Sequence, residues 1–520
     1  MPHPSVTALV APDKPAIIMG GSGDSLSYAL LDRLSNQGAQ LFRALGLRSG
    51  DHICMMMENH RLFMPIVWAA QRAGLIFTPV SCYLTKQEAV YILNNCGARV
   101  FIGSLQVADL CEEVLCEPCR VNHYFMVGGT RPGFASWEDA LAQQNDAPIR
   151  DQGNGMPMVY SSGTTGRPKG VFVPPLSDDV NTPPLLAHFQ GALGFDLETV
   201  YLSPAPLHHA GPLHYAMMAI YQGCTIVVME KFDAEQALKY IEHYRITHSQ
   251  WVPIMFIRML KLPRVLRESY DLSSLKVAIH AAAPCPEPVK EQMLEWWGGI
   301  LVEYYAASEG IGVTMIDSEE WLDHRGSVGR PVMGQVHIVD TDGGDLGTHE
   351  VGQVFFSGDH VTFSYYNEPD KTAQAYDDQG RATTGDVGYL DDEGYLYLTD
   401  RIQHTIISGG INIYPQEIEN VLVMHDKVAD AAVFGIPHEE FGEEVKAVVQ
   451  PVAWRHANAQ TATDILHWLR SHIAGPKMPR SLDFHPHLPR MDNGKLYKQE
   501  LVEDYRARDR ARSQWPGPEN

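Results

Sequence analysis

An eleven-residue segment rich in hydroxyls and glycines constrains this chain more than any other feature. Residues 160–170 read Tyr-Ser-Ser-Gly-Thr-Thr-Gly-Arg-Pro-Lys-Gly. Glycines let a backbone turn sharply and bring its N–H groups close to an anion, hydroxyls donate hydrogen bonds, and Lys169 adds a mobile positive charge. The segment therefore predicts a loop that holds a polyphosphate. A flexible turn or linker is the alternative interpretation of the same composition.

The spacing excludes the Walker phosphate loop. That loop needs Gly, four residues and then Gly-Lys-Ser/Thr, whereas Gly166 is followed here by Arg-Pro-Lys-Gly. A zinc site is not predicted either. Cys116 and Cys119 form a C-x-x-C without a second pair at zinc-finger distance, and His208, His209 and His214 do not form a His-Glu-x-x-His motif.

Composition narrows the class of protein and of partner. The 520 residues are 45% apolar and 20% charged, as in a soluble globular protein of several domains. A formal net charge of -23 argues against a nucleic acid or an anionic membrane as partner. The first residues carry no basic signal-peptide region, and no uncharged apolar run reaches the ~18 residues of a membrane span. We expect a cytoplasmic protein; the oligomeric state stays open, with a homodimer as one option.

The pattern of apolar residues predicts an α/β fold. Helical periodicity covers residues 26–46 and 65–73, strand-like runs lie at 53–57, 76–80, 100–102 and 124–127, and the alternation returns after the glycine-rich loop. This pattern favours doubly wound, largely parallel sheets. From about residue 326 to residue 401, short alternating strands and Gly/Asp turns predict a small antiparallel, barrel-like unit.

The last part of the chain reads as a second, smaller domain of α+β type. It has its own helix at residues 415–424 and its own strands at 429–435 and 444–450. We therefore expect a large N-terminal domain over residues 1–402 and a small C-terminal domain over residues 403–520. From about Ala507 the chain is charged and then rich in Gly and Pro, which predicts disorder.

Four further strings follow the loop in a fixed order. They are Tyr-Ala-Ala-Ser-Glu at 305–309, Thr-Gly-Asp at 384–386 followed by Arg401, Ser-Gly-Gly-Ile-Asn-Ile-Tyr-Pro-Gln-Glu-Ile-Glu at 408–419, and Pro-Arg-Met-Asp-Asn-Gly-Lys-Leu at 489–496. Each alone also fits a strand end, a turn, a helix start or a solvated lysine. Together, in this order and spacing, they resemble the adenylate-forming (AMP-binding) superfamily and its acyl-CoA synthetases, also called acid–thiol ligases.

The resemblance implies a site for Mg-ATP. In that family the tyrosine at the position of Tyr305 stacks on adenine, the hydroxyl at Ser308 meets the α-phosphate, the carboxylate at Asp386 accepts the ribose hydroxyls, and Arg401 assists. Magnesium would be held by Glu309 and Thr165, since hard oxygens suit this ion. Further residues at nucleotide-binding positions are Ser161, Ser162, Gly163, Thr164, Thr165, Gly166, Lys169, Ala282 and Ala283.

The resemblance also implies a reaction in two halves. A carboxylate attacks the α-phosphate of ATP to give an acyl-adenylate, and the thiol of CoA then attacks that anhydride. Lys495 would stabilise charge in the first half, Gly409 and Gly410 would line the pantetheine tunnel in the second, and His209 would border the carboxylate. In the family, a mobile C-terminal domain swings about a hinge and presents first the lysine and then the glycine pair to the site. The hinge position in this chain would be Gln403.

Several positions depart from the family pattern. Gln403 stands where a charged residue is usual, and Ala306 where glycine is usual. Residues 280–284 read His-Ala-Ala-Ala-Pro instead of Ser-Gly-Gly-Ala-Pro, and residues 206–209 read Pro-Leu-His-His instead of Pro-Leu-aromatic-His. The added methyl groups take up room and could reshape the route from adenine to the acyl group.

The sequence thus predicts an ATP-dependent acyl-CoA ligase that activates a hydrophobic acid of fatty, aryl or sterol-side-chain type. Three alternatives are weighed against it. Amino-acid adenylation would need an acidic residue near His208 and a fused carrier domain, and neither is present. A binding protein that had lost catalysis would lack Lys495 or Glu309, and both are present. A luciferase-like oxygenase would use the same motifs, so the sequence does not exclude it.

Overall fold

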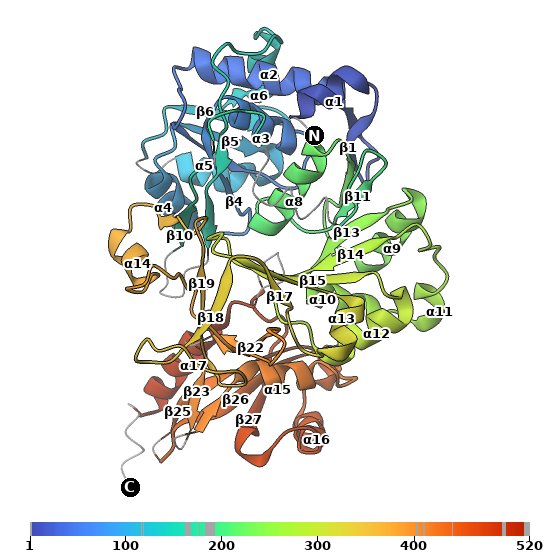
Figure 1. The fold of residues 1–520 in the computed structure, drawn as a ribbon, viewed down its shortest axis with the longest axis vertical. Helices are drawn as coiled ribbons and strands as arrows, with labels where there is room; N and C mark the ends of the chain where they lie inside the picture. Colours follow the sequence, from blue (N-terminus) through green and yellow to red (C-terminus); the bar gives the residue numbers. More distant parts are fainter. Residues whose placement is uncertain are drawn as a thin grey trace.

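The computed structural model describes residues 3–115, 117, 119–161, 168–175, 177–182, 193–401, 404–408, 411–438, 440–490 and 496–513. In Figure 1 the N-terminal part of the chain lies at the top, residues around 200–330 lie in the middle, and the C-terminal part lies at the bottom. No helix within these ranges is both long and apolar enough to cross a bilayer.

A six-stranded parallel sheet forms the N-terminal layer. Its order is β7 (Ala135–Ser136), β6 (His123–Val127), β5 (Val100–Ser104), β3 (His52–Met56), β4 (Ile76–Val80) and β8 (Met156–Pro157). Strand β3 is apolar and almost wholly buried, as expected for a central strand covered on both faces. Helix α3 (Phe63–Arg72) is buried along its whole length and packs on α2 (Tyr28–Ala44).

A nine-stranded sheet forms the second layer. Its order is β17 (Arg330–Met333), β16 (Val313–Asp317), β15 (Leu301–Ala306), β14 (Val277–His280), β13 (His248–Trp251), β11 (Val200–Ser203), β12 (Thr225–Val228), β1 (Pro15–Met19) and β2 (Ser25–Ser27). The strands from β15 to β1 are parallel, and antiparallel strands close both edges. These two sheets confirm the predicted α/β fold with parallel sheets.

Two small antiparallel sheets lie between these layers and the C-terminal part. One has the order β20 (Ser364–Tyr365), β10 (Lys169–Phe172), β9 (Val159–Ser161), and the other has the order β18 (Gln335–Val339), β19 (Gly352–Ser357), β21 (Asp386–Leu390), β22 (Leu396–Arg401). The prediction of a barrel-like unit is therefore wrong in one respect, because the described strands form an open sheet and do not close into a barrel. Among the described strands, β18 and β22 stay at opposite edges of an open sheet.

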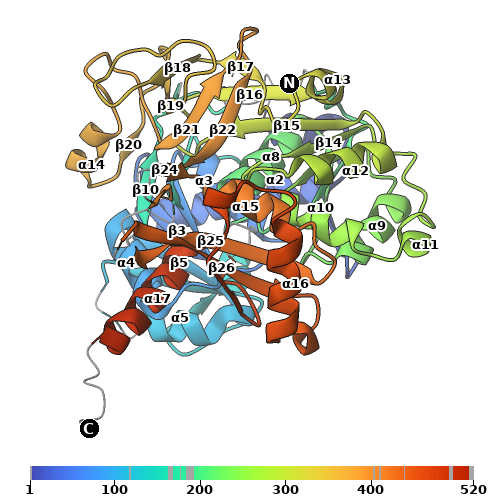
Figure 2. The same cartoon turned by 90° about the horizontal axis from the view of Figure 1, so that it is seen from below.

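The C-terminal residues form their own sheet and helices. The sheet has the order β24 (Ile411–Ile413), β23 (Ile406–Ser408), β26 (Gly442–Pro451), β25 (Val428–His438), with β27 (Ser481–Phe484) parallel to β26. Figure 2 shows β25 and β26 in front of the first sheet, with α15 and α16 beside them. The expectation of disorder from about residue 507 is wrong as far as Ser513, because α17 (Lys498–Ser513) continues to that residue.

The remaining helices lie before, between or after these strands along the chain. They are α1 (Pro4–Val10), α4 (Lys86–Cys96), α5 (Ala108–Leu115), α6 (Trp137–Ala142), α8 (Ala210–Tyr221), α9 (Ala234–His243), α10 (Pro253–Leu260), α11 (Arg264–Arg267), α12 (Glu287–Trp297), α13 (Ser318–Asp323), α14 (Pro369–Gln374), α15 (Pro415–Leu422) and α16 (Ala459–Leu469).

Candidate active site

One cavity of about 1310 Å³ is bordered by all of these parts of the molecule. Its walls come from the β9–β10 hairpin, the first turns of α8, the end of β15, the β21–β22 hairpin, α15 and the segment before α17. The sequence-predicted site residues that line it are Ser161, Lys169, His209, Ala282, Ala283, Tyr305, Ser308, Glu309 and Asp386. The fold thus brings motifs from distant parts of the sequence to one space.

The ends of the glycine-rich segment are fixed by two antiparallel strands. Ser161 closes β9 and lies opposite Lys169, which opens β10. The Lys169 Nζ atom lies 4.6 Å from the centre of the Tyr365 ring. Burial, followed by the charge of Lys371, lowers the pKa of the Lys169 ammonium, and the charge of Glu309 opposes this shift. The predicted phosphate-binding residues Ser162, Gly163, Thr164, Thr165 and Gly166 lie outside the described residues.

Two hydroxyl groups converge on the Asp386 carboxylate. Tyr305 Oη donates to Asp386 Oδ2 over 2.6 Å, and Thr384 Oγ1 donates to the same oxygen over 2.8 Å. Asp386 begins β21 and lies directly across the hairpin from Arg401, the last residue of β22. The carboxylate is thereby oriented at the cavity wall next to the aromatic ring that the sequence assigns to adenine.

Glu309 lies in the loop that follows β15, and it is 8% exposed. Tyr365 Oη donates a hydrogen bond to Glu309 Oε1 over 2.9 Å, so the ring that faces Lys169 also holds this carboxylate. Ser308 precedes Glu309 and lines the same cavity. Sequence reasoning missed Tyr365, because a tyrosine in a two-residue strand carries no spacing signal of its own.

Two further predicted positions border the cavity from the large sheet. Ala282 follows β14 and has a φ of 73°, a left-handed conformation that is strained for a residue with a Cβ atom. The bend carries Ala282 and Ala283 along the cavity wall. On the other side, His209 is the N-cap of α8, and its ring centre lies 4.5 Å from that of His208.

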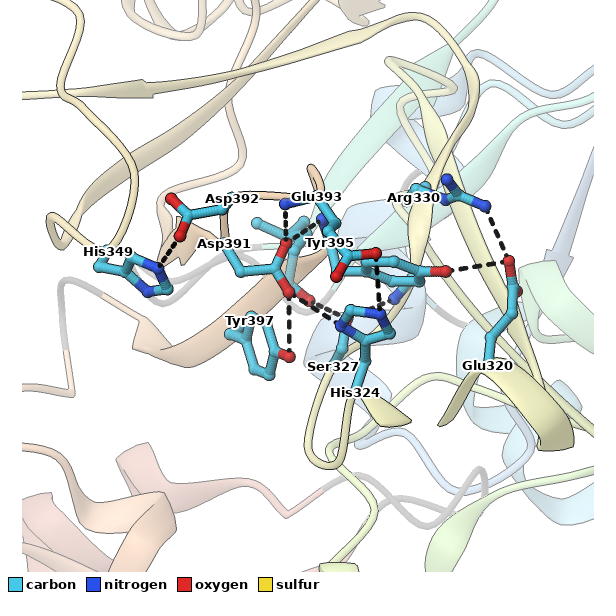
Figure 3. Close-up of polar contacts among 12 residues, drawn as sticks. Glu320, His324, Ser327, Arg330, His349, Asp391, Asp392, Glu393, Tyr395 and Tyr397 are labelled. Carbon is cyan, nitrogen blue, oxygen red and sulfur yellow. Dashed lines mark hydrogen bonds and ion pairs between the residues drawn. The ribbon is translucent and has the colours of Figure 1, made fainter. Parts of the chain in front are cut away.

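A polar network fixes the closed end of the β21–β22 hairpin (Figure 3). The His324 ring, which directly follows α13, stacks on Tyr395 at 3.6 Å, and its Nδ1 lies 3.0 Å from Asp391 Oδ2. Tyr397 Oη donates to the same Asp391 oxygen over 3.3 Å. Burial tends to raise the pKa of Asp391, but the N–H groups of Tyr395 and Glu393, together with His324, outweigh it and hold that pKa below its usual value.

A buried ion pair lies beside the cavity at β15. Lys290 Nζ lies 2.6 Å from Glu303 Oε2, and both side chains are almost completely buried. Burial raises the pKa of the Glu303 carboxyl, against the opposing charge and hydrogen bond of Lys290. His280 lies 3.7 Å from the same carboxylate oxygen, and burial lowers the pKa of its ring well below the usual value. The ring is therefore neutral, and the carboxylate pairs with the lysine.

The C-terminal candidates Gly409, Gly410 and Lys495, and the hinge candidate Gln403, lie outside the described residues. Residues on either side of the 491–495 segment do line the cavity, namely Arg490, Leu496 and Lys498. Lys498 Nζ lies 2.8 Å from Glu419 Oε1 of α15. Among the described residues, no group of three or more His, Cys, Asp and Glu side chains is placed to hold a metal ion.

Two family matches divide the chain. The family described as AMP-binding enzyme matches residues 5–366, and the family described as AMP-binding enzyme C-terminal domain matches residues 417–495.

Similar proteins cover nearly the whole chain. A long-chain-fatty-acid–CoA ligase, FadD13 of Mycobacterium tuberculosis, is 30% identical over 519 residues, covering 96% of this chain and 97% of that protein. A feruloyl-CoA synthase of an Amycolatopsis species is 31% identical over 497 residues, covering 95% and 96%. The crystal structure of ATP-bound MatB from Rhodopseudomonas palustris superposes with a TM-score of 0.79 at 26% identity, covering 97% and 99%.

Proposed function

Because this chain belongs to the AMP-binding enzyme family, we propose that it activates a hydrophobic carboxylic acid with ATP and transfers the acyl group to the thiol of CoA. In the first half, a carboxylate oxygen attacks the α-phosphorus and pyrophosphate leaves. In the second, the CoA sulfur attacks the acyl carbon and AMP leaves with the oxygen that bridged them. The observation that carries the proposal is the single cavity shared by Asp386, Tyr305, Glu309, Lys169 and His209.

Asp386 is the acceptor for the ribose of ATP. An ionised carboxylate can accept short hydrogen bonds from both hydroxyls of a vicinal diol. The hydrogen bonds from Tyr305 and Thr384 fix its orientation before the nucleotide binds, which reduces the entropy lost on binding. Tyr305 is then placed to offer its ring face to the adenine base.

Glu309 and Lys169 act on the phosphates. Magnesium would supply charge neutralisation between phosphate oxygens, and the Glu309 carboxylate, held by Tyr365, is a hard oxygen ligand suited to it, with Thr165 as the second candidate. Lys169 offers a partly desolvated cation at the same wall. A preorganised charge in a water-poor site stabilises a transition state more than the same charge in water does.

Lys495 would act in acyl-adenylate formation, and the Gly409–Gly410 pair would act in thioester formation. Both lie in the C-terminal domain if the domain boundary falls between residues 402 and 403. Arg490, Leu496 and Lys498 at the cavity wall support a role for their segment in the first half. Lys495→Ala should depress acyl-adenylate formation by orders of magnitude and leave thioester formation from a preformed acyl-adenylate largely intact. Equal loss in both half-reactions would remove Lys495 from this role.

The acyl group would lie beyond His209, where the cavity is bordered by Trp251, Ile254, Met217 and Met218. These side chains favour a hydrophobic acid of fatty, aryl or sterol-side-chain type. The names of FadD13 and the feruloyl-CoA synthase agree with an acid of the first two types.

A pyrophosphate-release screen tests the proposal. Purified protein is given Mg-ATP and a panel of fatty, aromatic, sterol-side-chain and amino acids, each with and without CoA, and thioesters are identified by mass. We expect CoA-dependent turnover and an acyl-CoA product for one acid class. Pyrophosphate release without a CoA thioester would indicate another acceptor, such as a carrier protein or oxygen. The absence of pyrophosphate release with every acid of the panel would contradict the proposed activity.

A further inference from the structure

The acyl side of the cavity has a polar wall that the proposed reaction does not use. Gly211, in the first turn of α8, faces Gln250 of β13 and Tyr304 of β15. A Cβ atom on Gly211 would stand 3.3 Å from Gln250 Nε2 and 3.6 Å from Tyr304 Oη. The glycine therefore lets the helix approach these two polar side chains closely, just beyond His209.

His214 presents a hydrogen-bond acceptor to this space. Its Nδ1 lies 2.7 Å from the carbonyl oxygen of Ala210. A carbonyl can only accept, so the proton is on Nδ1 and Nε2 carries a lone pair. Burial lowers the pKa of the His214 ring, which keeps it neutral. The side chain lines the cavity and is only partly buried, and Nε2 has no partner in the part of the chain that the structure describes.

Tyr304 presents a hydrogen-bond donor to the same space. Its Oη accepts from Gln250 Nε2 over 2.9 Å, while the Gln250 carbonyl oxygen accepts from Tyr201 over 3.4 Å. The hydroxyl proton of Tyr304 has no acceptor within the described ranges. Burial raises the pKa of Tyr304, so the group stays protonated. The ring is partly open to the cavity that it lines.

The acceptor and the donor lie on one stretch of wall. Gly211 and His214 are three residues apart on α8 and so share a helix face, about 5–6 Å apart. Gly211 in turn lies close to Tyr304, since a Cβ atom added to it would stand 3.6 Å from Tyr304 Oη. A purely hydrocarbon acid would bury both groups without a partner, which is unfavourable in a closed, low-dielectric site. A hydroxyl group can donate to one and accept from the other.

We propose that His214 and Tyr304 select an acid that carries a hydroxyl substituent on its hydrophobic body. This rests on the proposed function and narrows it, because it names the chemical class within the hydrophobic acids. The hydroxyl donates to His214 Nε2 and accepts from the Tyr304 hydroxyl, while the rest of the acid contacts the apolar wall formed by Trp251 and Met217.

Matched pairs of acids test this proposal. 3-Phenylpropanoic acid and octanoic acid are each compared with analogues hydroxylated at successive positions, as kcat/KM for CoA-dependent AMP formation and as binding measured by quenching of tryptophan fluorescence. We expect the best hydroxylated member to exceed its parent by roughly 10- to 100-fold, since sites built to hydrogen-bond a hydroxyl discriminate strongly against its absence. In Tyr304→Phe and in His214→Phe, the ratio of the hydroxylated acid's kcat/KM to that of its parent should fall at least several-fold.

Tyr221→Phe is the control variant. Tyr221 also lines the cavity, but its hydroxyl already donates to the Asn181 carbonyl over 2.8 Å, so this variant should keep the hydroxyl preference. The proposal would be overturned if the hydroxylated acids and their parents were turned over and bound equally well. It would also be overturned if the preference for the hydroxylated acid persisted in both Tyr304→Phe and His214→Phe. Turnover of the parent acids tests the ligase function separately, because it does not depend on the ratio.

Discussion

At the scale of single residues, the site depends on groups that other side chains hold in place. Asp386 is oriented by Tyr305 and Thr384, and Glu309 is oriented by Tyr365. These contacts need no ligand, so the geometry that would receive a ribose and a metal-bound phosphate exists before binding. Such preorganisation is what lets fixed charges act on a transition state without rearranging first.

Asp386→Asn should raise the KM for ATP by about tenfold or more, because an amide supplies one weaker acceptor where a carboxylate offers two. The KM for the acid should change far less. Steady-state kinetics with ATP varied at saturating acid and CoA would measure this. Asp392→Asn in the turn of the same hairpin is the matched control, since that side chain is 79% exposed. Unchanged ATP dependence would remove Asp386 from the nucleotide site.

Lys290→Met should destabilise the protein by about 3–5 kcal/mol, because it leaves the buried Glu303 carboxylate without its partner. The double variant Lys290→Met, Glu303→Leu should recover much of that loss, since it removes the unpaired charge as well. Urea unfolding at neutral pH measures both. If the double variant were as unstable as the single one, the buried charge would not be the cause.

The sequence predicted these sites unevenly. Motif residues such as Asp386 and Glu309 were predicted as site residues because the family spacing marks them. Tyr365, which holds Glu309, and Gln250, which holds Tyr304, were missed because each acts through a contact between segments far apart in the chain. No local pattern encodes such a contact. The glycine-rich segment was predicted from its sequence, and the structure describes its two ends, residues 160–161 and 168–170.

At the scale of elements, the β21–β22 hairpin joins the site to the large sheet. Asp386 and Arg401 lie paired at its open end, while His324 and Tyr397 hold Asp391 at its closed end (Figure 3). The sequence predicted the strands of this unit and the parallel sheets correctly, since the spacing of apolar residues and the positions of turn residues indicate strands. It predicted the closure of the barrel wrongly, because closure depends on pairing between distant strands.

Asp391 makes the hairpin sensitive to acid. Its pKa is lower in the folded protein than in the unfolded chain, so its contribution to stability is present above the unfolded pKa of about 3.9 and is lost as the pH falls below it. Asp391→Asn should therefore lower the melting temperature at pH 6 and close the gap to wild type as the pH approaches 2. Thermal unfolding across this range measures the effect. A constant gap at all pH values would contradict it.

At the scale of the whole molecule, α10 connects the large sheet to the C-terminal sheet. Lys261, just after α10, donates to the carbonyl of Val428 in β25. Desolvation beside the C-terminal sheet lowers the pKa of the exposed Arg258 side chain, and the charge of Asp430 opposes that shift. One hydrophobic cluster includes Ile257 from this side and Val428 from the other. These contacts favour one orientation of the two parts.

Lys261→Met should therefore weaken this orientation without touching a substrate. We expect a several-fold lower rate of acyl-adenylate formation, while thioester formation from a preformed acyl-adenylate stays the same or rises, because a different orientation would serve that half. Lys239→Met is a suitable control, since Lys239 pairs only with Glu235 on the surface of α9 among the described residues. An equal fall in both half-reactions would contradict the orientation effect.

In the proposed reaction, one cavity first forms an acyl-adenylate and then an acyl-CoA. The most direct measurement uses an acid whose two carboxylate oxygens are the heavy isotope ¹⁸O, with Mg-ATP and CoA, and mass analysis of the products. We expect one heavy oxygen in AMP and one in the thioester, because the attacking carboxylate oxygen stays on phosphorus. Unlabelled AMP, or label in inorganic phosphate or pyrophosphate, would contradict it.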